Sequence, residues 1–282
     1  MKVLKPINNN VVSCVDAAGR EVVAMGRGLG YGVKSGAEMP EDVPEKIFRM
    51  DSQGETDRLK QLLLTLPAEE IELCGRIIAY ADQTLNKKLS QSIYLTLTDH
   101  LVFALDRMRQ GMAFQNALLT EVRLFYPREF AVGRHALELI RTEMQVDFPE
   151  DEAANIALHL VNAEYDTSLS GTLHSTQALH DITGVLAGWP GITLRGDSLY
   201  YDELIVHLKL LVLRVFSRTE GDEAAAEPNF VSAIRSVCPR EYTCAQAVAH
   251  YLEKQSGRTV FDEEAAYLAV QIHRANDRRQ RR

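Results

Sequence analysis

Hydrophobic and polar positions follow two different rhythms along the chain. In the first fifty residues, short runs rich in Val, Leu and Ile alternate with turn residues, which is typical of antiparallel strands. From residue 55 onward, apolar positions recur every three to four residues, which indicates amphipathic helices. The predicted strands cover 2–7, 11–15, 21–25 and 46–50, and the predicted helices cover 58–65, 70–85, 91–109, 114–125, 128–142, 150–162, 173–186, 201–217, 229–237, 241–253 and 263–275. The pattern predicts an α+β multidomain chain, with a small N-terminal antiparallel β-sheet followed by all-α helical bundles.

The helical part of the chain repeats itself. A shift of 112 residues places 127–130 on 239–242 and 152–159 on 264–271 without a gap. Further upstream the shift is 107, and it places His100 and Arg107 on His207 and Arg214. Such self-similarity indicates two copies of one helical domain. We therefore expect three domains, at 1–56, 57–168 and 169–282.

Composition and charge narrow the class of protein. The chain has 282 residues, 46% hydrophobic, with a net charge of −8, which excludes a disordered chain and a globally basic nucleic-acid coat. Residues 1–35 nevertheless carry five Lys or Arg against two Asp or Glu. No apolar run approaches the roughly 18 residues of a membrane span. The four cysteines form no Cys-x-x-Cys pair, so neither a disulfide framework nor a metal site is expected. No cofactor is expected either. We expect a cytoplasmic protein without a signal peptide.

The basic N-terminal part of the chain, called the head below, carries a glycine-rich run, Gly26-Arg27-Gly28-Leu29-Gly30. It lacks the Lys-Ser/Thr of a phosphate-binding loop, which argues against a nucleotide site. This part of the chain offers several groups that suit unpaired RNA bases: the bare backbone at the glycines, the Arg27 guanidinium, the Tyr31 ring and the amides of residues 8–10. The alternative is a structural glycine-rich hairpin with Asn in its turn. The head and the body thus have different predicted tasks.

Three of the eight histidines stand out because of the repeat. His100 and His207 occupy matching places in the two copies, and His159 lies on the last helix of the first copy. One hypothesis is a metal site, although no metal-ligand spacing is present. The other is a phosphate acceptor, since a neutral imidazole is a good nucleophile. Asp99 is a candidate to orient His100, and the acidic run 150–152 is interpreted as favouring a helix N-terminus.

At this point the residues resemble a known family. The head, with Ile7-Asn8-Asn9-Asn10-Val11 and Met25-Gly26-Arg27-Gly28, resembles the co-antiterminator RNA-binding domain of the BglG/SacY/LicT transcriptional antiterminators. The two helical copies resemble that family's paired phosphotransferase-regulation domains, the PRDs. Ser92-Ile93-Tyr94, Thr98-Asp99-His100 and the segment 152–162 are signatures of the first of these domains. The resemblance covers essentially the whole chain.

The resemblance implies an RNA target. In this family the head forms a homodimer that binds a stem-loop in leader mRNA, the ribonucleic antiterminator, and thereby prevents a terminator from folding upstream of sugar-utilisation genes, here by expectation a β-glucoside operon. DNA is not an expected partner. The positions that match the family's RNA contacts are Lys5, Asn8, Asn9, Asn10, Gly26, Arg27, Gly28 and Tyr31.

The resemblance also implies control by phosphorylation. A sugar-specific permease of the phosphotransferase system inhibits through the first helical domain, and the phosphocarrier HPr activates through the second, so the membrane is involved only through the permease. The matching acceptors are His100, His159 and His207. The fourth position holds Gln271, which cannot accept phosphate, and His273 lies two residues on, roughly 200° around a helix.

No catalytic residue or turnover is expected, so the protein is predicted not to be an enzyme. Two alternatives stay open: a helical metallohydrolase or phosphotransferase that uses His100 and His159, and a DNA-binding regulator with the same body.

Overall fold

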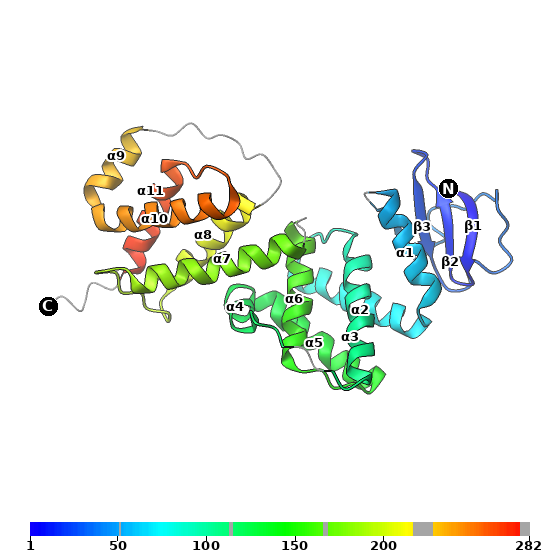
Figure 1. The fold of residues 1–282 in the computed structure, drawn as a ribbon. Coiled ribbons are helices and arrows are strands. Elements are labelled where there is room, and N and C mark those ends of the chain that lie inside the picture. The colour runs from blue at the N-terminus through cyan, green and yellow to red at the C-terminus, as the bar shows by residue number, and fades with distance from the viewer. Residues whose placement is uncertain (51, 113–114, 166–168, 217–227, 277–282) are drawn as a thin grey trace. The chain divides into compact units, whose positions relative to one another are not determined.

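The computed structural model describes the chain except residues 51, 113–114, 166–168, 217–227 and 277–282 (Figure 1). It confirms the predicted α+β class, with a small antiparallel sheet followed by helices. The described strands are β1 (Lys2–Asn8), β2 (Val11–Val15), β3 (Glu21–Met25) and β4 (Lys46–Phe48). The described helices are α1 (Gln53–Thr65), α2 (Ala68–Leu85), α3 (Ile93–Arg109), α4 (Leu119–Phe125), α5 (Pro127–Met144), α6 (Glu150–Tyr165), α7 (Leu169–Gly188), α8 (Leu199–Phe216), α9 (Pro228–Val237), α10 (Pro239–Ser256) and α11 (Asp262–Ala275).

The four strands form one antiparallel sheet in the order β1-β2-β3-β4. Side chains alternate between its faces, as the period of a strand requires. On one face Val11, Val23 and Phe48 pack into the same apolar core as Leu59 and Leu63 of α1. The opposite face is covered by the segment that follows β3, through residues such as Leu29, Val33 and Met39. A single chain thus places apolar side chains against both faces of the sheet, and dimerisation stays a prediction.

Helix α1 is held on the sheet by polar contacts as well. Glu21 of β3 accepts hydrogen bonds from Ser13 Oγ (2.5 Å), Lys60 Nζ (2.7 Å) and Gln53 Nε2 (2.5 Å). Burial raises the pKa of Glu21, but these hydrogen bonds and the charge of Lys60 outweigh burial and hold it below its usual value. Helix α1 begins at an N-cap, where the Ser52 side chain accepts from Glu55 N. The sheet, α1 and the first helical domain share one core.

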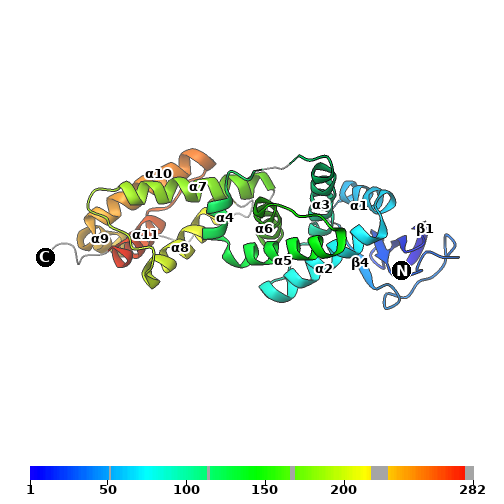
Figure 2. The same ribbon diagram turned by 90° about the horizontal axis from the view of Figure 1, so that it is seen from below.

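The described residues divide into two compact units, Met1–Asn116 with Arg128–Asp166, and Ala117–Pro127 with Thr167–Arg282. Helix α4 therefore belongs to the second unit, where it lies beside α7 (Figure 2). Glu121 Oε1 lies 2.7 Å from His180 Nδ1 of α7, and Lys209 of α8 lies over the Tyr126 ring. The predicted helix over 114–125 begins only at Leu119, and residue 114 lies outside the described residues. The expected domain boundaries at 56/57 and 168/169 stay predictions.

Helices α5 and α6 approach each other closely at Gly133. A Cβ atom at this residue of α5 would lie 2.2 Å from the carbonyl oxygen of Ala153 in α6. Because that atom belongs to the backbone, we expect Gly133→Ala to lower the free energy of unfolding by about 1–3 kcal/mol, as overpacking does. Chemical denaturation of the purified protein measures this change.

Gly75 of α2 provides the matched control, because a Cβ there meets nothing within 4 Å. Gly75→Ala should raise stability by up to about 1 kcal/mol through helix propensity. If both variants shifted stability in the same direction, the close approach of α5 and α6 would not be what fixes residue 133 as glycine.

Candidate functional site

A loop and a turn close against each other at one end of the sheet. The loop 26–31 follows β3, and the turn 8–10 joins β1 to β2; the pairing of Val11 with Met25 brings the two together. Gly26 N and Gly30 N donate to the carbonyl oxygens of Asn10 and Asn9, both at 2.9 Å. A Cβ on Gly30 would lie 2.1 Å from Asn8 O, so only glycine fits there. Local backbone contacts thus build a rigid surface.

The asparagines of the turn mostly hold this surface together. Asn10 Oδ1 accepts from Gly28 N at 2.9 Å. Asn8 Oδ1 accepts from Asn10 N, and Asn8 Nδ2 donates to Leu63 O of α1, both at 2.9 Å. Asn8 therefore connects the turn to α1, while Asn9 is exposed. Their roles as RNA contacts stay predictions.

Besides Asn9, three of the predicted RNA-binding side chains are presented to solvent. Arg27 extends from the loop, Tyr31 is 80% exposed, and Lys5 is exposed on the edge strand β1. A large aromatic ring that is so exposed beside a guanidinium is suited to stack on an unpaired base while the cation meets phosphate or a base edge. The structure brings the predicted loop and turn residues together, with Lys5 further along β1.

In the first helical domain, a buried carboxylate joins α3 to α6. Glu152 Oε2 lies 3.0 Å from His100 Nε2, and Glu152 Oε1 accepts from the Arg107 guanidinium at 2.8 Å. Asn155 Nδ2 also donates to Glu152 at 3.0 Å. Burial raises the pKa of Glu152, but the hydrogen bonds from His100 and Asn155 and the charge of Arg107 hold it below its usual value. An ionised carboxylate only accepts hydrogen bonds, so His100 donates to Glu152 from Nε2.

His159 completes this cluster from α6. Its ring lies 4.8 Å from the His100 ring, centroid to centroid, and the residue is 6% exposed. Burial, followed by the charge of His100, lowers the pKa of His159 to about 3, so the ring is neutral at pH 7. Its Nδ1 is buried without a hydrogen-bond partner among the described residues. The first domain thus holds two imidazoles side by side.

The second helical domain repeats the arrangement with differences. Arg214 of α8 pairs with Glu264 of α11, the counterparts of Arg107 and Glu152. Burial and the charge of Arg214 lower the pKa of His207. Its Nε2 has no hydrogen-bond partner within the described part of the chain. The described structure therefore leaves this imidazole nitrogen unused by the protein, in contrast to His100.

Gln271 stands where many family members have histidine, and the nearby His273 pairs with a carboxylate. His273 Nδ1 lies 3.3 Å from Glu241 Oε1, at the start of α10. Asn276 Nδ2 donates to the same oxygen at 3.3 Å. Burial raises the pKa of Glu241, but a backbone hydrogen bond, the hydrogen bond from Asn276 and the charge of His273 hold it below its usual value.

Sequence reasoning missed the carboxylates and arginines of these clusters. Glu152 lies in the first turn of α6, as interpreted, but it is also buried and contacts α3, which the sequence interpretation did not include. Asp99, a candidate to orient His100, is exposed. A signal was present: His100 and Arg107 lie seven residues apart, as do Glu152 and His159. In the second copy the first spacing recurs as His207 and Arg214, and the second as Glu264 and Gln271. Residues seven apart share one helix face, so each pair could be placed on one face of its own helix, although not against the other pair.

Comparisons with known proteins agree with this architecture. The CAT RNA binding domain family matches residues 1–57, and the PRD domain family matches 75–163 and 191–275. The chain is 36% identical to the transcription antiterminator LicT of Bacillus subtilis, over 97% of this chain and 98% of LicT. The chain belongs to the BglG/LicT family of antiterminators. It is also 34% identical to the beta-glucoside operon antiterminator of Dickeya chrysanthemi, over 97% of this chain and 96% of that protein.

A solved structure supports the fold of the N-terminal part. The crystal structure of GlcT CAT-PRDI aligns with a TM-score of 0.51 and 29% identity, over 58% of this chain and 97% of that chain. The loop 26–31 and the turn 8–10 lie within the CAT match. His100 and His159 lie within the first PRD match, and His207 lies within the second. Among the described residues no group of three or more His, Cys, Asp or Glu is arranged to hold a metal ion, and no helix is long and apolar enough to cross a membrane.

Proposed function

We propose that this protein binds a hairpin in the leader mRNA of a sugar-utilisation operon and holds it so that a transcription terminator cannot form. The observation that carries the proposal is the loop 26–31, which is closed onto the turn 8–10 and presents Arg27 and Tyr31 to solvent in a CAT RNA-binding domain. A β-glucoside operon is the favoured target, since one relative of 34% identity carries that function in its name.

Phosphorylation of His100, His159 and His207 controls the activity in this proposal, with HPr and a sugar-specific permease as donors. Neutral imidazoles with a free lone pair are the required nucleophiles, which supports His159 and His207, whose pKa values are lowered. Phosphate added to His100 would bring negative charge into the cluster that contains the Glu152 carboxylate, and the repulsion would loosen α3 from α6. Phosphorylation thereby changes the packing of the domain.

The remaining parts of the proposal follow from this role. The protein acts as a cytoplasmic homodimer, accepts phosphate without turning over a substrate, and needs neither DNA, a metal nor a cofactor. The imidazole clusters lie in the PRD matches, which supports a regulatory role for His100 and His159 over a hydrolase.

Replacing Arg27 by alanine tests the RNA-binding surface. In a titration of the full chain with labelled leader RNA of the neighbouring sugar operon, Arg27→Ala should weaken binding by about 10- to 100-fold, the range of a lost guanidinium contact to a base. Folding should be unchanged, because the Arg27 side chain is exposed.

Arg20→Ala is the matched control. Arg20 pairs with Asp16 in the turn between β2 and β3, at the other end of the sheet, so the same charge is removed away from the loop. Duplex DNA of the same sequence controls for nucleic-acid type. Equal losses in both variants, or equal binding of RNA and DNA, would contradict a specific RNA surface at Arg27.

A further inference from the structure

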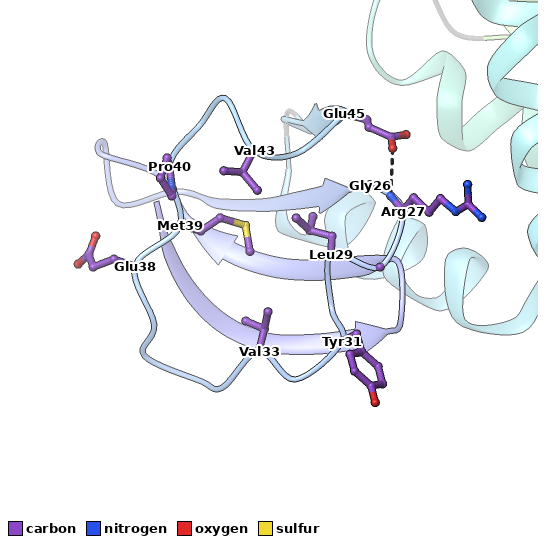
Figure 3. A pocket seen from close by; sticks show the side chains of 11 residues that line it. Gly26, Arg27, Leu29, Tyr31, Val33, Glu38, Met39, Pro40, Val43 and Glu45 are labelled. Carbon is purple, nitrogen blue, oxygen red and sulfur yellow. Dashed lines mark hydrogen bonds between the residues drawn. The ribbon is translucent and has the colours of Figure 1, made fainter.

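A cavity of about 420 Å³ opens beside the loop 26–31 on the head (Figure 3). Leu29, Val33, Met39 and Val43 point toward it and form an apolar floor. Its size lies within the range of small-ligand sites, and an apolar floor with a few polar groups at the rim is their usual character. The cavity is continuous with the proposed RNA surface, because Gly26, Arg27, Gly28 and Tyr31 also line it.

Glu45 lies at the end of the cavity that is next to Arg27 (Figure 3). Its position follows from the sheet: Met25 pairs with Lys46, so the next residues outward, Gly26 and Glu45, lie opposite each other. The backbone nitrogen of Glu45 lies 3.2 Å from the place of a Cβ on Gly26. Glu45 Oε1 accepts from Arg27 N at 3.1 Å. These contacts hold the Glu45 carboxylate beside the protein loop 26–31.

A carboxylate is an unexpected group on a surface that meets RNA, because it repels phosphate. Its favourable role in nucleic-acid recognition is to accept hydrogen bonds from base donors. A carboxylate offers about four lone-pair sites on two oxygens, and Arg27 N occupies one of them. The other lone-pair sites of the Glu45 carboxylate can accept from a ligand, because the side chain is exposed at the rim of the cavity.

We propose that this cavity holds one unpaired base of the RNA hairpin and that Glu45 reads its donor edge. The proposal rests on the RNA-binding function above. Guanine is the expected base, because its N1–H and N2–H are adjacent donors that match the two oxygens of one carboxylate. The apolar floor contacts the face of the base, while Arg27 and Tyr31 meet the neighbouring nucleotides. Glu45 is therefore a specificity-determining residue.

Glu45→Gln in the full chain tests this assignment, because glutamine keeps an oxygen for Arg27 N but offers a donor where guanine also donates. With the leader hairpin RNA as probe, binding should weaken about tenfold. Inosine, which lacks the N2 amine, is then placed at each unpaired guanine in turn. One such replacement should weaken binding of the wild type and should cause no further loss in Glu45→Gln.

Asp42→Asn is the matched control, since Asp42 is exposed in the same loop and does not line the cavity. Removing a negative charge by itself should keep or strengthen RNA binding. Unchanged affinity in Glu45→Gln, or a loss that is the same for every inosine position, would overturn base reading and leave Glu45 as a support for Arg27. No RNA binding by the wild type would instead overturn the proposed function.

Discussion

Replacing Glu152 by alanine should lower the free energy of unfolding of the first helical domain by about 3 kcal/mol, the cost typical of removing one partner from a buried ion pair. The Glu152 side chain is 3% exposed and its partner Arg107 is 18% exposed, so water cannot replace the lost carboxylate well. The same change removes the hydrogen bond to His100 that joins α6 to α3. Denaturant unfolding, followed by circular dichroism, measures the loss.

Glu264→Ala in the second domain is the matched control, because the repeat places it where Glu152 lies in the first. Its side chain is 22% exposed and that of Arg214 is 59% exposed, so this pair is screened by water. The expected loss is below about 1 kcal/mol, as for other surface pairs. Similar losses in both variants would show that burial of Glu152 is not what makes its pair important.

His207 should be the sole phosphate acceptor of the second domain. In a chain without first-domain acceptors (His100→Ala with His159→Ala), incubation with phosphorylated HPr should add one phosphate. Adding His207→Ala should remove it completely, because Gln271 carries no imidazole and His273 is paired with Glu241. Intact mass measured at neutral pH gives the number of phosphates.

Gln271→His on the same background provides the converse change. It restores an imidazole at the place that His159 occupies in the first copy, so the expected number of phosphates rises to two. Phosphate that persists in His207→Ala and maps to His273 would contradict the prediction and would make His273 the replacement acceptor.

Much of the fold was predictable from the chain alone. The strands of the head and most helices lie within a few residues of the predicted ranges, because period-two and period-3.6 patterns report directly which faces are buried. The start of α7 at Leu169, before the predicted start at 173, and the start of α4 at Leu119, after the predicted start at 114, were missed. Helix ends depend on caps and neighbours more than on periodicity.

The sequence by itself determined the architecture, the repeat, the family and the candidate residues, because these are properties of pattern and spacing. Only the tertiary structure decided which of them meet. The register of β3 on β4 places Glu45 opposite Gly26, and the packing of α3 on α6 places Glu152 on His100. Neither contact is local in the chain, so no spacing measured along one element specifies it. Partners and burial arise when separate elements pack, and these set the charge and reactivity of each group.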